Sequence, residues 1–176
     1  MGIGIQICGL NGCGKSTLGK VLAEKIGFHF IDNENLYFSR TNTNEPYTNA
    51  KSRIEVERLL MEEVSKHPDF VFAAVKGDYG KDIIQIYDYI VMMEVPKNIR
   101  ARRVRNRSFQ KFGDRMLMGG DLHSQEEAFF QMVDSRQDDY VETWLQTVNC
   151  PIIRVDGTKP IEDNVDYIIK EIDIKL

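Results

Sequence analysis

The chain has 176 residues, of which 42% are hydrophobic and 28% charged, and its formal net charge is −4. This balance predicts one globular domain with a buried core and excludes a chain that is mainly disordered. The negative charge gives no basic footprint for nucleic acid or an anionic membrane, and no apolar run is long enough to span a bilayer. Three scattered cysteines without a Cys-x-x-Cys pair, and no signal-peptide pattern at the N-terminus, predict a cytoplasmic protein with neither disulfides nor a zinc site.

Short apolar segments alternate along the chain with segments of helical periodicity. The pattern predicts strands over residues 3–8, 28–31, 70–75, 90–95 and 151–155, and helices over residues 16–26, 50–66, 97–110, 125–147 and 161–172. Such alternation is typical of a parallel sheet covered by helices on both faces, a three-layer α/β/α architecture. Two stretches, residues 33–49 and 111–124, interrupt the alternation, and we expect them to form binding loops or lids.

The first predicted strand leads into the segment GLNGCGKS, which matches the pattern G-x-x-x-x-G-K-[ST] without deviation. Glycines let the backbone approach phosphates, and the N–H groups of the loop and of the following helix attract anions. Lys15 would add a charge near the β- and γ-phosphates, and Ser16 a hydroxyl for Mg²⁺. Cys13 is interpreted as a small loop residue rather than a reactive thiol. We therefore predict ATP and Mg²⁺ as cofactors, bound by Asn11, Gly12, Cys13, Gly14, Lys15, Ser16 and Thr17.

Five arginines lie between positions 100 and 107, directly before the glycine-containing stretch 111–124. On a helix, Arg100, Arg103 and Arg107 share one face. Phosphoryl transfer needs cations that close over the transferring group, so we predict that at least two of these arginines act there. The alternative is a solvated basic face. Asp114 and Asp121 are expected to pair with arginines of the same region.

Taken together, these motifs resemble those of the P-loop kinases that include nucleoside-monophosphate kinases and shikimate kinases, nearly from end to end. The resemblance implies a P-loop NTPase fold with five parallel strands in the order 2-3-1-4-5, a lid over residues 111–124 and an acceptor-binding insertion over residues 33–66. It also implies that Arg103 and Arg107 stack on adenine and touch phosphates. The pattern Arg136-x-x-x-Tyr140 resembles the helix after the lid, whose arginine reaches the transferring phosphate.

The segment from Val155 to Pro160 resembles the adenylate kinase loop that packs on the adenine ring. This implies contacts from Gly157, Thr158 and Pro160. From the residues alone, the segment is also compatible with a simple strand-to-helix turn in which Thr158 caps the helix.

The acceptor end departs from both families. Asp32-Asn33-Glu34 resembles the Asp-x-Asp of shikimate kinase, which implies that Asp32 orients an acceptor hydroxyl or holds a magnesium water. Glu34, Arg40 and Arg53 stand where acceptor-binding residues occur in these families. From the residues alone, Asp32 is also a helix cap and Arg53 a surface charge.

The third predicted strand contains no Walker B aspartate, and the first candidate is Asp78, which follows Lys76-Gly77. Adenylate and shikimate kinases carry other segments at this point. Lys76 either faces an anionic acceptor or lies in a solvated turn at the carboxyl edge of the sheet.

The sequence thus predicts a kinase that transfers the γ-phosphoryl group of MgATP to a small hydroxyl- or phosphate-bearing acceptor. Its predicted catalytic residues are Lys15, Arg107, Arg136 and Asp32, and its predicted metal contacts are Ser16 and Asp32. Two alternatives stay open: an ATP-binding regulatory or sensor module without phosphotransfer, and a phosphotransferase that modifies antibiotics or nucleosides. We expect neither nucleic acid nor a membrane as a partner, and we expect a monomer or a dimer. We also expect no metal site made of protein ligands alone, because the three histidines share no metal-binding spacing.

Overall fold

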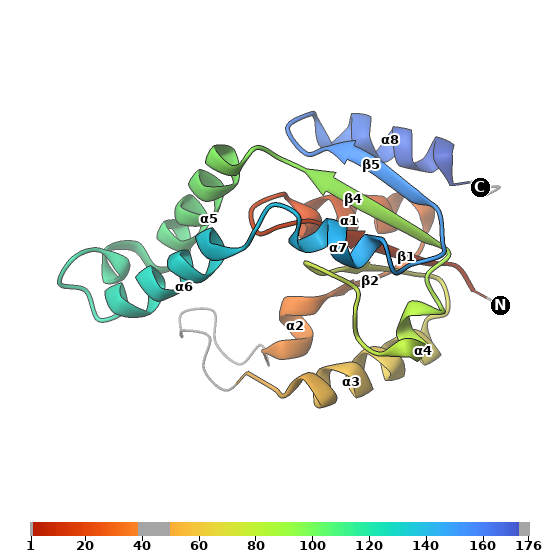
Figure 1. Ribbon diagram of the computed structural model, residues 1–176, viewed down its shortest axis with the longest axis horizontal. Helices are drawn as coiled ribbons and strands as arrows, with labels where there is room; N and C mark the ends of the chain where they lie inside the picture. Colours follow the sequence, from red (N-terminus) through yellow and green to blue (C-terminus); the bar gives the residue numbers. More distant parts are fainter. Residues whose placement is uncertain (1, 39–49, 173–176) are drawn as a thin grey trace.

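A computed structural model describes residues 2–38 and 50–172, and its centre is a five-stranded sheet (Figure 1). All neighbouring strands pair in parallel, in the order β2-β3-β1-β4-β5. The strands are β1 (Gly4–Cys8), β2 (His29–Asp32), β3 (Phe70–Ala73), β4 (Tyr89–Glu94) and β5 (Ile152–Asp156). The predicted strand order is confirmed.

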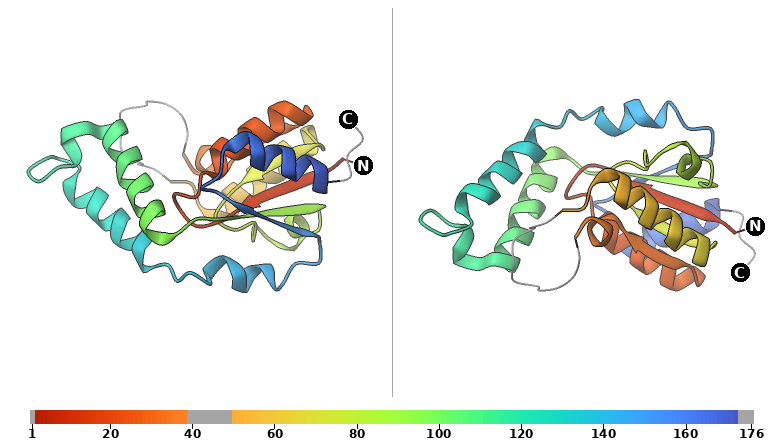
Figure 2. Two further views of the ribbon diagram at one scale, coloured as in Figure 1. Left: turned by 90° about the horizontal axis from the view of Figure 1, so that it is seen from above. Right: turned by 90° about the horizontal axis from the view of Figure 1, so that it is seen from below.

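Helices cover both faces of this sheet. The described helices are α1 (Lys15–Ile26), α2 (Asn33–Tyr37), α3 (Arg53–Lys66), α4 (Lys81–Ile84), α5 (Lys97–Phe112), the short 3₁₀ helix η1 (Gly113–Met116), α6 (His123–Ser135), α7 (Tyr140–Leu145) and α8 (Ile161–Glu171). Figure 2 shows α1 and α8 together on one side of the sheet and α7 on the other. Every residue of β1 and β3 is buried, as expected for central strands of a parallel sheet. The three-layer architecture is therefore confirmed.

Helices α5 and α6 form a hairpin that projects away from the sheet (Figures 1 and 2). The hairpin has a hydrophobic cluster of its own, formed by Val104, Phe112, Met116, Leu122, Phe130 and Val133. Residues 111–124 make its distal end. There Arg115 pairs with Asp121 at 2.7 Å, which confirms that an aspartate of this stretch pairs with an arginine.

The prediction of one long helix over residues 125–147 is wrong. Helix α6 ends at Ser135, Arg136 is extended (φ −66°, ψ 126°), and the chain becomes helical again only at Tyr140. The break lets Arg136 contact Asn11 and lets Asp138 pair with Arg100 at 2.9 Å. These long-range contacts override the local helical periodicity. Helix α4 was not predicted, and α2 was implied only by the alternative of Asp32 as a helix cap, because segments of four or five residues show no periodicity.

None of the helices in residues 2–38 and 50–172 has the length and apolar character that a bilayer crossing requires.

Candidate phosphate and acceptor site

The glycine-rich loop joins the carboxyl end of β1 to the N-terminus of α1. Gly9, Gly12 and Gly14 adopt positive φ angles of 144°, 85° and 97°. The loop closes on itself through Leu10, whose carbonyl accepts hydrogen bonds from the Cys13 N–H at 3.3 Å and from the Lys15 ammonium at 3.1 Å. This is the concave backbone that an anion requires.

Helix α1 adds its N-terminus to the same loop. Gly14 is the cap residue and offers no side chain to the first N–H groups of the helix. Lys15, Ser16 and Thr17 are the first three helical residues, so their N–H groups have no partner within the helix. A phosphate would satisfy these donors and the positive end of the helix dipole. The loop and helix therefore fit the phosphates of a nucleotide.

Arg103 supports the loop from α5. Its guanidinium donates to the carbonyl oxygens of Gly12 at 3.4 Å, Cys13 at 3.5 Å and Gly157 at 3.1 Å. In a trans peptide the N–H points away from the carbonyl, so a contact to the Cys13 carbonyl turns the Gly14 N–H to the opposite side. Arg103 therefore holds the loop in a shape that presents donors, which is a different contact from the adenine stacking that the resemblance implies.

The positive charges of two arginines, Arg107 and Arg136, act on Lys15 of the loop. The pKa of Lys15 is lowered from 10.5 to about 8, mainly by burial; Cys13 and Cys8 oppose this shift, and the positive charges of Arg107 and Arg136 contribute to it. Like charges repel each other, and a bound anion would reduce the repulsion. Arg136 also contacts Asn11 of the loop, whereas the Arg107 side chain is exposed on α5 and acts on Lys15 through its charge. Burial also raises the pKa of the Cys13 thiol, as befits a small packed residue rather than a reactive one.

Arg136 links the end of α6 to the phosphate loop. Its guanidinium donates to the side-chain oxygen of Asn11 and lies 5.5 Å from the centre of the Tyr140 ring. The Lys76 ammonium lies 4.1 Å from the centre of the same ring. Two cations from distant segments therefore share one aromatic ring beside the loop.

Asp78, the Walker B candidate, is paired with cations on both sides. Its carboxylate lies 3.2 Å from the Lys76 ammonium and 3.4 Å from the Arg53 guanidinium, which also donates to the Asp78 carbonyl. The Arg53 guanidinium lies 5.2 Å from the centre of the Tyr79 ring, and the Tyr79 hydroxyl donates to the Asn33 side chain at 2.7 Å. Arg53 and Lys76 are therefore both placed at the carboxyl edge of the sheet, as the acceptor hypothesis requires.

Asp32 is a helix cap. Its Oδ1 accepts a hydrogen bond from the Glu34 N–H at 3.0 Å at the start of α2. The alternative interpretation of Asp32 as a cap is thus borne out. A role in catalysis would have to use the other carboxylate oxygen, Oδ2. Glu34 is exposed one residue inside α2. Arg40 lies outside the described residues.

The loop after β5 lies against the phosphate loop. The Arg103 guanidinium donates to carbonyl oxygens of both loops, to Gly157 in one and to Cys13 in the other. Asp156 Oδ1 accepts hydrogen bonds from both the N–H and the hydroxyl of Thr158. Pro160, not Thr158, is the cap residue of α8, so the turn with Thr158 as cap is wrong in its detail. Thr158 and Pro160 are exposed beside Gly157.

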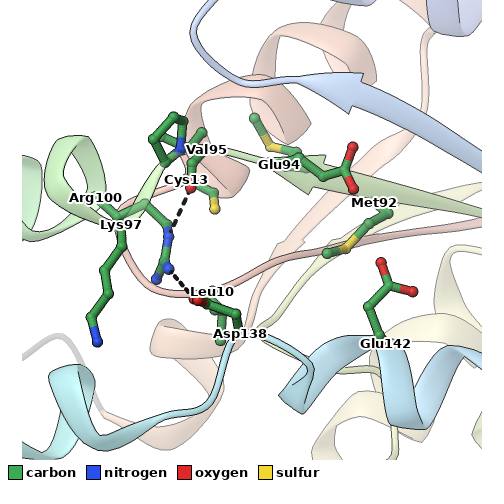
Figure 3. Close-up of a pocket in the computed structure, with 11 residues that line it drawn as sticks. Leu10, Cys13, Met92, Glu94, Val95, Lys97, Arg100, Asp138 and Glu142 are labelled. Atoms are coloured by element: carbon green, nitrogen blue, oxygen red, sulfur yellow. Dashed lines mark hydrogen bonds and ion pairs between the residues drawn. The ribbon is translucent and has the colours of Figure 1, made fainter.

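Arg100 has a structural place that the helix-face argument did not predict. Its side chain is buried, where it donates to the Val95 carbonyl at 2.9 Å and pairs with Asp138 at 2.9 Å (Figure 3). These contacts border a pocket of about 240 Å³ that is lined on one side by Leu10 and Cys13 of the loop.

Acidic groups line the other side of this pocket. Glu94 and Glu142 are both paired with Arg154, whose hydrogen bond holds the pKa of the Glu142 carboxyl below its usual range. Lys97 and Arg100 also line the pocket, so its charged side chains are of both signs.

Sequence reasoning missed the two aromatic residues of the site, Tyr79 and Tyr140. Tyr140 was part of a quoted pattern, but nothing in that pattern indicated that Lys76 would meet it. Tyr79 follows Asp78 directly, and its position after the third strand was the only feature of the sequence that indicated a place in the site.

A phosphate-binding loop at the carboxyl edge of a parallel sheet ordered 2-3-1-4-5, with a cationic hairpin beside it, defines the P-loop small-molecule kinases of the nucleoside-monophosphate kinase and shikimate kinase group. The chain belongs to the AAA domain family, whose model matches residues 5–121.

Similar proteins span nearly the whole chain. The uncharacterized protein YqaC of Bacillus subtilis is 24% identical over 173 residues, which cover 94% of each chain. The structure of shikimate kinase from Bacteroides thetaiotaomicron is similar with a TM-score of 0.60 at 19% identity, over 98% of this chain and 99% of that one. A gluconokinase from Sinorhizobium meliloti is similar with a TM-score of 0.53 at 17% identity, over 93% and 87%. At these identities the solved structures bear on the fold.

Proposed function

We propose that the chain transfers the γ-phosphoryl group of MgATP to a small hydroxyl- or phosphate-bearing acceptor that also carries a negative charge. The observation that carries the proposal is the single ring of Tyr140, which Arg136 of the phosphate side and Lys76 of the acceptor side both approach. The two cations mark two adjoining anion sites, one for the donor phosphates and one for the acceptor.

The residues have separate tasks in this reaction. The loop N–H groups and Lys15 bind the donor phosphates, and Arg107 and Arg136 offset the charge that spreads over the transferring oxygens. The acceptor oxygen forms a bond to the γ-phosphorus while the bond to the β–γ bridging oxygen breaks, and ADP leaves. Asp32 is the candidate to receive the proton of an acceptor hydroxyl. The Ser16 hydroxyl would hold magnesium, which would supply charge compensation for the donor phosphates.

The proposed acceptor region contains Asn33 of α2 and Arg53 of α3, which both contact Tyr79. Lys76 and Arg53 approach Asp78 from two directions and leave the region rich in positive charge around one carboxylate. An acceptor carboxylate or phosphate would be attracted to these cations. The names of the similar proteins fit this chemistry, because both shikimate and gluconate are hydroxylated carboxylates. The proposed lid is the α5–α6 hairpin, with residues 111–124 at its end.

The test is a coupled assay of ADP release with a panel of shikimate, gluconate, nucleoside monophosphates and neutral sugars. We expect an anionic acceptor to stimulate ADP release, and Lys76→Met to raise its KM at least tenfold while ATP affinity is kept. Lys81→Met, which removes an exposed lysine of α4, is the matched control. A neutral sugar as best acceptor, or an unchanged KM in Lys76→Met, would contradict the anionic acceptor.

The pairing of Asp78 favours a second candidate, an ATP-binding regulatory module without phosphotransfer. A carboxylate already neutralised by Lys76 and Arg53 is less available to a magnesium water than an unpaired Walker B aspartate. This candidate predicts tight binding of ATP and no ADP release with any member of the acceptor panel.

A further inference from the structure

Two histidines and a glutamate meet at the end of the sheet opposite the phosphate loop. His29 is the first residue of β2, Glu63 lies in the last turn of α3, and His67 is the residue that caps α3. The His29 Nε2 atom lies 3.2 Å from Glu63 Oε2, and the two imidazole rings stack with centroids 3.8 Å apart. The potential ligand atoms of all three residues lie within 4.8 Å of one another.

The backbone of each residue is held by regular structure. The His29 N–H donates to the Asp69 carbonyl at 3.0 Å, at the start of the β2–β3 pairing. The His67 N–H donates to the Glu63 carbonyl at 2.9 Å, which completes the last turn of α3. The cluster is therefore built on a strand and a helix end, and its three members need no loop rearrangement to stay together.

The cluster already contains the support that a metal-binding carboxylate usually has. Glu63 Oε2 faces His29, while Glu63 Oε1 lies 3.3 Å from the Lys66 ammonium. Oε2 can thus ligate a cation while Oε1 keeps its pairing with Lys66, in the manner of an outer-shell contact.

We propose that His29, Glu63 and His67 form a binding site for a divalent transition metal of the zinc class. Two imidazoles and one carboxylate are ligands that Zn²⁺ accepts, with water in the fourth position of a tetrahedral site. A ligated metal lies close to the plane of each imidazole, so one of the stacked rings must turn. His67 is the exposed member of the cluster, and its side chain is the one that can turn about χ2.

This site is separate from the nucleotide chemistry. Parallel strands all begin at one edge of the sheet, so the first residue of β2 lies at the edge opposite the loop that follows β1. Bound metal would join the start of β2 to the end of α3, the helix whose first residue, Arg53, contacts Asp78. The inferred role is structural, and it holds whether or not the chain transfers phosphate.

Metal binding is tested by titrating chelator-treated, full-length protein with Zn²⁺ in a calorimeter and with Co²⁺ by visible absorption. We expect one Zn²⁺ per chain with micromolar affinity, and a loss of at least tenfold in His29→Ala, Glu63→Gln and His67→Gln. Glu62→Gln, a neighbouring glutamate that pairs with Arg58, and His123→Ala, the remaining histidine, are the matched controls and should bind as wild type does.

A measurement on the wild type keeps the proposal testable if the variant at His29 fails to fold. On addition of Zn²⁺, the imidazole proton resonances of His29 and His67 should shift while those of His123 stay in place. Absence of a one-to-one complex, unchanged affinity in Glu63→Gln, or a Co²⁺ spectrum with thiolate charge-transfer bands would overturn the site.

Discussion

Arg136, the residue directly after α6, donates a hydrogen bond to the side-chain oxygen of Asn11 in the phosphate loop. Arg136 has an extended backbone conformation, and its hydrogen bond to Asn11 connects the α5–α6 hairpin to the loop. Arg103, from the other helix of the hairpin, touches the same loop through Gly12 and Cys13. Both helices of the hairpin, or the residue directly after them, therefore contribute a contact to the phosphate loop.

Replacement of Lys15 tests the donor site. Lys15→Ala should lower the rate of ATP-dependent phosphotransfer about a hundredfold to a thousandfold, the loss typical of removing one donor to the transition-state charge. The measurement is ADP release with the best acceptor of the panel. Lys20→Ala, an exposed lysine one turn along α1, should keep full activity. Full activity in Lys15→Ala would show that the loop does not serve phosphotransfer.

Nucleotide binding should take up a proton in weakly alkaline solution. The pKa of Lys15 is about 8 in the free protein, and a bound phosphate favours its charged form. ATP binding above pH 8 should therefore absorb up to one proton per chain, measured by calorimetry in buffers of different ionisation enthalpy. Lys15→Arg keeps its charge at every pH of the experiment and should abolish the uptake. Equal uptake in both proteins would exclude Lys15 as its source.

The lowered pKa of Lys15 also predicts how the free energy of unfolding depends on pH. Between about pH 8 and 10.5 the unfolded chain holds the Lys15 proton and the folded chain does not, so the contribution of Lys15 to the free energy of unfolding rises with pH. Below pH 8 both states are protonated, and the burial of the charge disfavours folding at a constant level. The difference in free energy of unfolding between wild type and Lys15→Met should thus change across this window only. Denaturant titrations at pH 7, 8, 9 and 10 would show a flat difference if the pKa were ordinary.

Arg103 and its neighbour Arg102 offer a matched pair on α5. Arg103→Ala removes donors to Gly12, Cys13 and Gly157, so we expect ATP affinity to fall about tenfold and the free energy of unfolding to fall by about 1–3 kcal/mol. Arg102 is exposed, and Arg102→Ala should change the free energy by less than about 0.5 kcal/mol. Denaturant titration measures the free energy of unfolding, and calorimetric titration with ATP measures the affinity. Equal affinities in the two variants would deny Arg103 its supporting role.

Two glycines of the loop should respond differently to alanine. At Gly12 a Cβ atom would lie 2.5 Å from the Arg100 carbonyl oxygen, which belongs to the backbone and cannot move aside easily. At Gly14 the nearest atom would be the terminal methyl of Met93 at 3.8 Å, so only the positive φ resists, at about 1–2 kcal/mol. Gly12→Ala should therefore lower the free energy of unfolding more than Gly14→Ala. The reverse order would mean that the loop does not pack on α5 as described.

Much of the donor half followed from local sequence. The glycine-rich loop, the strand before it and the helix after it are contiguous, and their chemistry depends on backbone conformations that glycine and helix periodicity specify within a few residues. The strand order came from resemblance to a family whose connections are the same. By contrast, the break after Ser135 accompanies long-range contacts of Arg136 and Asp138, which local periodicity does not contain.

What only the tertiary structure decided is which distant residues meet. The sequence by itself determined a phosphate loop, an alternating α/β pattern and a cationic helix, because each is written in neighbouring residues. It carried no signal that Lys76 and Arg136 would share the ring of Tyr140, or that His29 would reach Glu63 and His67 across the edge of the sheet. Such meetings depend on how strands are ordered and helices are laid across them, and packing of the whole core, rather than local spacing, sets those positions.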